Sequence, residues 1–349
     1  MLTESRALNH LGLVYLWLGH YGLAADHHRQ ALVLVRELGD QVAEGVLLGN
    51  LGNDYARQGR LAQAASHLRQ ALELSREIGD QNDECYTLTC LGGICYQQGS
   101  YQEATDHQRQ ALAMSRELGD IGAEAEALTR LGQLCHRQGR YAQAAGYHQE
   151  ALDLNRHTGD PDGEAEALNG AGETLLATGQ PDHARTCHAS ALTLTRETGN
   201  PREQARALTG LAAVSRRLGD HGQAFGYGQQ ALALYRELGD LVGEAEALNG
   251  AGETLLATRR PAEAYEQHIA ALTLTRQTGD RYQQARAYHG LAEACRVVGQ
   301  ADEARQHRQH ALDIYADLGV PEAASVPTSS PAAVILAGRA PAESRGGST

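Results

Sequence analysis

The chain has 349 residues, a net charge of −13 at pH 7, and 30 basic side chains, all of them arginine. Because lysine is absent, P-loop NTPases and enzymes that depend on a Schiff-base lysine are excluded. The negative net charge disfavours contact with a phosphate backbone, so we expect no direct nucleic-acid partner.

No segment is long and apolar enough to cross a membrane, and no membrane partner is expected. The apolar run at residues 11–19 follows Glu4 and Arg6, and it aligns with a segment that recurs throughout the chain. It is therefore part of the fold and not a secretory signal, and a cytoplasmic location is expected.

A period of 40 residues runs through the chain without insertion or deletion. Ala-Leu recurs at 31–32, 71–72, 111–112, 151–152, 191–192, 231–232, 271–272 and 311–312. Gly-Asp recurs at 39–40, 79–80, 119–120, 159–160, 239–240 and 279–280, with Gly-Asn at 199–200. Self-similarity of this kind is typical of solenoids. We divide residues 1–320 into eight repeats, from 1–40 to 281–320.

Each repeat predicts two helices, as the second repeat illustrates. Asp40 is a suitable N-cap for a first helix at residues 41–58, whose apolar positions Leu48, Leu51 and Tyr55 share one face. Gly59 then ends that helix. A second helix is predicted from Leu61 to Ile78, with Gly79 as its stop.

Small residues occupy fixed columns of the repeat. Glycine lies in the middle of the first helix at residues 52, 92, 132, 172 and 252, where it costs up to about 1 kcal/mol relative to alanine. We expect close approach of the second helix to compensate for that cost. The alanine column that includes Ala64, Ala104 and Ala144 is the predicted opposing surface.

The pattern of Leu51, Gly52, Tyr55, Ala64, Leu68 and Ala71 resembles the tetratricopeptide repeat signature. The longer period resembles the kinesin-light-chain type of repeat. The segment GEAEALNGAGETLLAT, found at both 163–178 and 243–258, is similar to the C-terminal repeat regions of actinobacterial antibiotic regulatory and NB-ARC-type regulators. The resemblance implies an all-α, right-handed α-solenoid over residues 1–320. The Pro-, Ser-, Ala- and Gly-rich segment 321–349 is predicted to be a disordered tail.

Histidine and cysteine columns raise the question of a metal site. One histidine column holds residues 27, 67, 107 and 307, and the next holds 28, 148, 188 and 268. We interpret both as solvated or groove-edge histidines that make hydrogen bonds. Cys85, Cys90 and Cys95 are spread around a helix by their spacing of five, which argues against zinc. No metal, no cofactor and no catalytic residue is expected.

The concave groove is the candidate functional surface, because in a solenoid of this type the first helices line it. Two polar columns and several arginines are offset from the apolar stripe of these helices. The predicted groove-binding residues are Asn53, Arg57, Thr129, Gln133, Arg137, Asn169, Glu173, Arg216, Arg217, Asn249, Glu253 and His289. Such a mixed polar groove suits an extended peptide or a helix of a partner protein.

The sequence is consistent with two functions. The first is a non-enzymatic scaffold that binds a protein or peptide in the groove. The second is the sensory arm of an antibiotic regulatory or NB-ARC-type transcriptional regulator, detached or truncated from its NTPase and DNA-binding domains. Neither end of the repeat array has a polar capping segment, and this favours either missing neighbours or end-to-end self-association.

Overall fold

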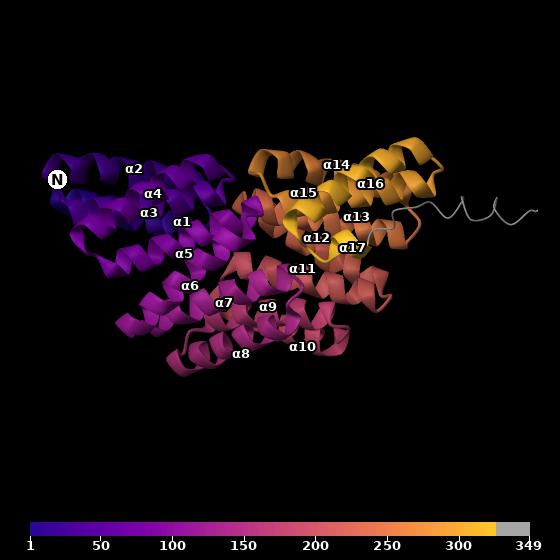
Figure 1. Ribbon diagram of the computed structural model, residues 1–349, viewed down its shortest axis with the longest axis horizontal. Helices are drawn as coiled ribbons and strands as arrows, with labels where there is room; N and C mark the ends of the chain where they lie inside the picture. The colour runs from indigo at the N-terminus through magenta and orange to yellow at the C-terminus, as the bar shows by residue number, and fades with distance from the viewer. Residues whose placement is uncertain (326–349) are drawn as a thin grey trace, which may run out of the picture.

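The computed structural model describes residues 1–325. These residues form helices and no strand. The helices are α1 (Leu2–Trp17), α2 (Tyr21–Leu38), α3 (Gln41–Arg57), α4 (Leu61–Ile78), α5 (Gln81–Gln98), α6 (Tyr101–Leu118), α7 (Ile121–Arg137), α8 (Tyr141–Thr158), α9 (Pro161–Ala177), α10 (Pro181–Thr198), α11 (Pro201–Arg217), α12 (His221–Leu238), α13 (Leu241–Ala257), α14 (Pro261–Thr278), α15 (Arg281–Val297), α16 (Ala301–Leu318) and α17 (Glu322–Ser325). Each repeat contributes one antiparallel pair, and consecutive pairs stack into the predicted α-solenoid (Figure 1).

The helix ends follow from local sequence signals. The side chain of Asp40 accepts a hydrogen bond of 3.1 Å from the Ala43 amide and so caps α3. Gly59 and Gly79 adopt φ values of 72° and 74°, in the left-handed region where glycine has no steric cost. The corresponding glycine of the seventh repeat is replaced by Arg259, which adopts φ 60°.

Mid-helix glycines make room for side chains of the partner helix, though not for the predicted alanine column. A Cβ at Gly52 would lie 2.7 Å from Leu68 Cδ2, and a Cβ at Gly172 would lie 2.6 Å from His188 Nε2. The opposing residue is therefore the one four positions after the alanine column. Ala64 is itself fully buried, as predicted for a packing position.

The second histidine column lies in the core, and its interpretation as solvated was wrong. Its members are at most 1% exposed: His28, His148, His188 and His268. Each ring fills the space above a glycine of the first helix, which is why a polar ring is tolerated there. In the other column, the rings of His27 and His67 stack on Tyr15 and Tyr55.

The core consists of two clusters of buried residues that follow the stack of helices. The alanine of the Ala-Leu pair is fully buried in every repeat: Ala31, Ala71, Ala111, Ala151, Ala191, Ala231, Ala271 and Ala311. One cluster of buried residues extends from Cys85 to Val320. Each repeat thus buries its apolar face against the next one, so stability is a sum over neighbours.

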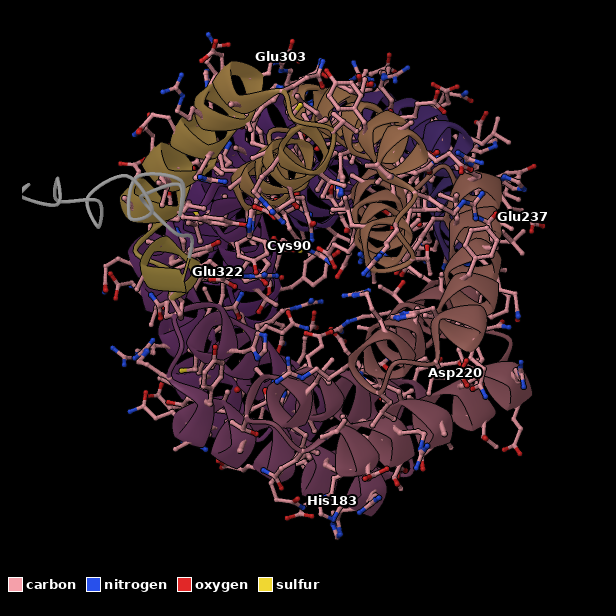
Figure 2. All side chains as sticks on the ribbon, turned by 90° about the vertical axis from the view of Figure 1, so that its right-hand side faces the viewer. Cys90, His183, Asp220, Glu237, Glu303 and Glu322 are labelled. Carbon is pink, nitrogen blue, oxygen red and sulfur yellow. The ribbon has the colours of Figure 1, made fainter. Side chains whose placement is uncertain are left out.

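The solenoid turns so tightly that distant repeats meet. Viewed along the long axis, the helices surround a central space (Figure 2). A Cβ at Gly19 would lie 3.3 Å from the Cα of Leu238, and a Cβ at Gly59 would lie 2.7 Å from Thr278 Cγ2. A Cβ at Gly99 would overlap the side chain of Leu318. Repeats one, two and three therefore contact repeats six, seven and eight.

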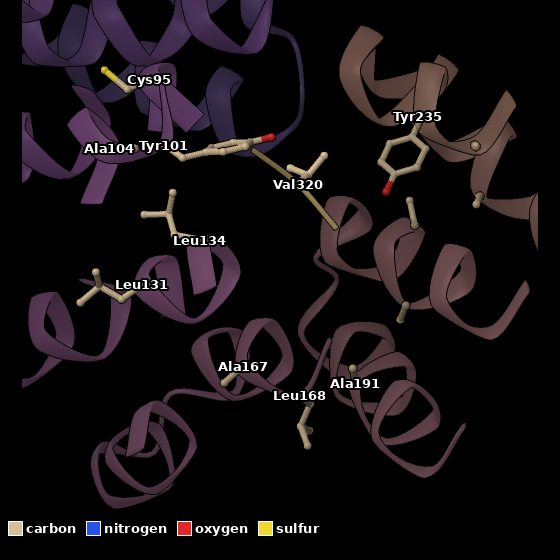
Figure 3. Packing of buried hydrophobic residues seen from close by; sticks show 14 of the residues in the cluster. Cys95, Tyr101, Ala104, Leu131, Leu134, Ala167, Leu168, Ala191, Tyr235 and Val320 are labelled. Carbon is tan, nitrogen blue, oxygen red and sulfur yellow. The ribbon is translucent and has the colours of Figure 1, made fainter. Parts of the chain in front are cut away.

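The chain after α16 turns back against the third and fourth repeats. Val320 is 4% exposed and belongs to the same buried cluster as Tyr101 (Figure 3). The Tyr282 hydroxyl donates a hydrogen bond of 2.5 Å to Glu322. The tail predicted to begin at residue 321 therefore has a first part that packs on the solenoid, and residues 326–349 lie outside the described residues.

Candidate functional site

A cavity of about 240 Å³ lies inside the turn of the solenoid. It is lined by the inner faces of α3, α5, α7, α9, α11, α13 and α15, with additional residues from second helices. The labelled Cys90 lies on this inner side in Figure 2, whereas Glu237 and Glu303 lie on the outer side. The cavity is thus enclosed by seven of the eight repeats.

Ion pairs between repeats cover much of the cavity wall. Arg206 pairs with Glu173 at 3.0 Å, and Arg130 pairs with Glu166 at 3.1 Å. Burial alone would raise the pKa of the Glu173 carboxyl, but the charge of Arg206 outweighs burial and lowers it to about 2. These groups are therefore charged at neutral pH and link neighbouring first helices.

A second cluster of ion pairs lies towards the C-terminal end. Glu253 pairs with Arg216 at 2.6 Å and with Arg286 at 2.7 Å. Burial would raise the pKa of Glu253, but the two arginines lower it to about 2. None of these three residues lines the cavity.

Arg137, in the fourth repeat, contacts aromatic side chains of the third and eighth repeats. Its Nε and Nη2 donate hydrogen bonds of 3.0 and 2.9 Å to the Tyr96 hydroxyl. Its guanidinium lies 3.6 Å from the ring centre of Tyr282, which belongs to the eighth repeat. A cation over an aromatic face contributes about 0.5–2 kcal/mol. This contact joins the fourth and eighth repeats.

The structure separates the predicted site residues into three groups. Those that line the cavity are Asn53, Arg57, Gln133, Arg137 and Glu173. Those that lie outside it on partly or fully exposed surface are Arg216, Arg217, Glu253 and His289. Those that are buried between helices are Thr129, Asn169 and Asn249. Only the first group belongs to the candidate binding site in the cavity.

The buried group serves packing, which corrects the placement of one polar column on the groove surface. Asn169 donates to the Glu203 carbonyl at 3.3 Å and contacts His188 Nδ1 at 3.1 Å. Asn249 makes the equivalent bonds with Gln283 and His268. Thr129 donates to the Ala125 carbonyl at 3.0 Å. Their helical position faces the next repeat and not the cavity.

Sequence reasoning missed a neighbouring column that does face the cavity. Its members are Tyr86, Glu126, Glu166, Arg206 and Glu246, and Arg202 precedes one of them by a turn. Each member lies seven residues before a position of the polar column that was predicted to face the groove, namely 93, 133, 173, 213 and 253. Residues seven apart share a helix face. The spacing of seven therefore predicts that this column faces the cavity. The residue types in the column vary too much to form a recognisable motif.

One group of potential metal ligands lies outside the cavity. Ligand atoms of Cys95, Glu103 and His107 all lie within 4.8 Å of one another. Burial and the adjacent Glu103 carboxylate raise the pKa of the Cys95 thiol to about 12. The thiol hydrogen-bonds to Glu103.

A second surface is apolar. Helix α1 exposes Leu13, Val14, Trp17 and Leu18 by 41–59% at the N-terminal end of the stack. The predicted end-to-end association would use this face, and it stays a prediction. Within residues 1–325, no helix has the length and hydrophobicity needed to cross a bilayer.

Stacked helix pairs around a polar cavity define an α-solenoid repeat protein. The tetratricopeptide repeat profile matches residues 3–77, 83–157, 163–237 and 243–317, and the chain belongs to the tetratricopeptide repeat family. This confirms the family predicted from the repeat signature. No curated protein sequence matches significantly.

Solved structures share this fold at low sequence identity. A Rap protein complexed with competence and sporulation factor aligns with a TM-score of 0.62 and 14% identity, over 93% of this chain and 95% of that chain. The Rap conjugation gene regulator of plasmid pLS20, in complex with the Phr* peptide, aligns with a TM-score of 0.56 and 14% identity, over 78% and 95%.

A third similar structure is a longer protein. A signal transduction ATPase with numerous domains (STAND) and a tetratricopeptide repeat sensor, from Pyrococcus horikoshii, aligns with a TM-score of 0.53 and 15% identity. The alignment covers 89% of this chain but 47% of that chain. This chain therefore spans about half the length of the STAND protein.

Proposed function

We propose that the chain is a protein-interaction scaffold that binds a short, extended peptide segment in the central cavity. The observation that carries this proposal is the convergence of polar side chains from seven repeats on one cavity. Asn53, Gln133 and Glu173 offer hydrogen-bonding groups to a peptide backbone, and the cavity has apolar wall atoms as well. Concave sites with a few convergent polar groups are typical of ligand binding.

An extended segment fits better than a helix. An α-helix with side chains is about 10–12 Å wide. The cavity volume of about 240 Å³ suits a few extended residues better than a helix of that width. The two Rap structures, which are complexes with competence and sporulation factor and with the Phr* peptide, share the same fold over most of this chain and give independent support.

The test is to obstruct the cavity without disturbing the fold. Gly93 lines the cavity, and a Cβ there would meet no atom within 4 Å. We expect Gly93→Phe to place a ring in the cavity and to lower the affinity for bound peptides by about tenfold or more. Gly146→Phe is the matched control, because Gly146 has equal free space on the exposed side of α8.

Binding is measured with a soluble mixture of random hexapeptides. Retained peptides are separated with the protein by size exclusion and identified by mass spectrometry, and their affinities are then measured by calorimetry. The proposal predicts retention by the unmodified protein and by Gly146→Phe. It is overturned if no peptide is retained, or if Gly93→Phe retains the same peptides equally well.

The second candidate is a sensory arm of a larger regulator. The alignment with the STAND protein, in which the tetratricopeptide repeats are a sensor, is the observation that favours it. The nucleotide sequence before the Met1 codon tests this proposal directly. An open reading frame that continues upstream into an NTPase domain supports the sensory arm, and a promoter and ribosome-binding site directly before Met1 oppose it.

A further inference from the structure

The carboxylate of Asp240 attracts Arg57, but it is ion-paired with Arg202 instead. Arg57 ends α3 and lines the cavity, and it makes no hydrogen bond or ion pair with any residue in the part of the chain that the structure describes. The other cavity arginines are different: Arg130, Arg202 and Arg206 pair with carboxylates, and Arg137 is bonded to Tyr96. Arg57 is half-buried, and an anion that paired with it would offset part of the cost of holding a charge without a direct partner there.

A second guanidinium faces the same place. Arg202, at the first turn of α11, pairs with Asp240 at 3.0 Å, and its charge is the main reason that the pKa of Arg57 is lowered. Burial lowers the pKa of Arg57 further. Two arginines, from repeats two and six, thus line the same cavity and act on each other electrostatically. Guanidinium groups bind carboxylates well because their planar donors match both oxygens.

The cavity also contains an unpaired carboxylate. Glu246 lies on the inner face of α13, and within residues 1–325 it forms no hydrogen bond or ion pair. Burial and the nearby charge of Glu173 raise its pKa. The arginines closest to it are already engaged, since Arg286 binds both oxygens of Glu253 and Arg206 binds Glu173. A ligand cation would give Glu246 a partner.

We propose that the cavity recognises a peptide with opposite charges at two positions: a carboxylate bound between Arg57 and Arg202, and an ammonium or guanidinium group bound by Glu246. This inference rests on the proposed function and specifies the ligand. The carboxylate is a free C-terminus or an acidic side chain, and the cation is the N-terminus or a basic side chain. Both charged subsites lie in one cavity, so one short peptide reaches both.

The experiment compares the peptides selected by four variants of the full chain. Arg57→Gln and Glu246→Gln each remove one unpaired charge and keep a polar side chain of similar length. Arg196→Gln and Glu237→Gln are the matched controls, because these two residues are exposed on the outer helices α10 and α12. The probes are the random hexapeptide mixture and the same mixture amidated at the C-terminus.

The unmodified protein and both controls are expected to enrich peptides that carry a carboxylate and a basic group. Arg57→Gln should lose the selection for the carboxylate, with at least about a tenfold fall in affinity for the selected peptides. Glu246→Gln should lose the selection for the basic group and keep that for the carboxylate. Preference for free over amidated peptides identifies the C-terminus as the carboxylate source.

The outcomes separate this inference from the proposed function. If the unmodified protein retains peptides without any charge preference, the two charged subsites are refuted and the peptide-binding function stands. The same conclusion follows if both cavity variants select the peptides that the controls select. If no peptide is retained by any variant, both proposals are overturned. Circular dichroism of each variant establishes that the helices are intact.

Discussion

His148, His188 and His268 are each packed between glycines of two neighbouring first helices, where water does not reach them. Burial lowers the pKa of all three to about 4. Nδ1 of His188 and of His268 contacts an asparagine side chain, whereas both ring nitrogens of His148 lack a partner within the described residues. The neutral ring is the form that this environment accepts.

This burial predicts a pH-dependent loss of stability. In the unfolded chain histidine titrates near about pH 6.5. Between this value and pH 4 the unfolded state binds protons that the folded state does not, so the free energy of unfolding falls as pH is lowered through this window. Each of the three histidines contributes at most roughly 3 kcal/mol. Asp83, whose pKa burial raises to about 6, acts in the opposite direction.

Urea unfolding at several pH values between 7 and 4.5 measures the effect. The control is the triple variant His148→Gln, His188→Gln and His268→Gln, because Gln108 occupies the same column naturally. The triple variant should lose most of the dependence between pH 6.5 and 4.5. Equal slopes for the two proteins would contradict the assignment of the effect to these histidines.

At the scale of the helix pair, polar residues join one repeat to the next. Asn169 bonds both to His188 in its own repeat and to the Glu203 carbonyl in the following one. In the fourth repeat Thr129 stands at the corresponding position and bonds only to Ala125. The fourth repeat therefore has a buried histidine, His148, without the amide partner that the fifth repeat supplies.

Thr129→Asn should repair this difference. The new amide would accept from, or donate to, His148 Nδ1, and we expect the free energy of unfolding to rise by about 1 kcal/mol. The reciprocal change Asn169→Thr leaves His188 unpartnered and should lower it by about 1–3 kcal/mol. Urea unfolding with hydrogen exchange in α7–α10 measures both. A loss of stability in Thr129→Asn with helicity intact would refute this reasoning.

Helix ends could be predicted from neighbouring residues, whereas the residues that face the cavity depend on contacts between repeats. The end of α3 was predicted to within one residue and α4 was predicted completely, because Asp40, Gly59 and Gly79 are local signals. Thr129, Asn169 and Asn249 were predicted to face the groove, but they are buried between helices. A polar residue that bonds to the following repeat has the same local pattern as a solvated one, so only packing distinguishes them.

At the scale of the whole molecule, the cavity forms because the N-terminal repeats contact the C-terminal repeats. Contacts of Gly19 with Leu238 and of Gly59 with Thr278 place the N-terminal repeats against the C-terminal ones. Arg137 and Tyr282 add a contact between the fourth and eighth repeats. No repeat encodes this meeting by itself, because it depends on the small rotation between successive repeats summed over the array. The sequence therefore predicted a groove but not an enclosed cavity.

A designed disulfide tests the enclosed cavity most directly. A Cβ at Gly19 would lie 3.4 Å from the Cβ of Leu238, close to the spacing of about 3.5–4.5 Å that disulfides require. Gly19→Cys combined with Leu238→Cys is compared with Gly179→Cys combined with Leu238→Cys, since Gly179 has similar backbone angles and no neighbour within 4 Å. Peptide mapping by mass spectrometry distinguishes the new bond from the six native thiols.

We expect dilute oxidation to link residues 19 and 238 within one molecule, and to link the control pair only to a minor extent. The linked protein should keep its helicity and its capacity to retain peptides. If residues 19 and 238 stay unlinked while the helices are intact, the first and sixth repeats are not in contact in solution. The enclosed cavity, and the binding site that we place in it, would then be contradicted.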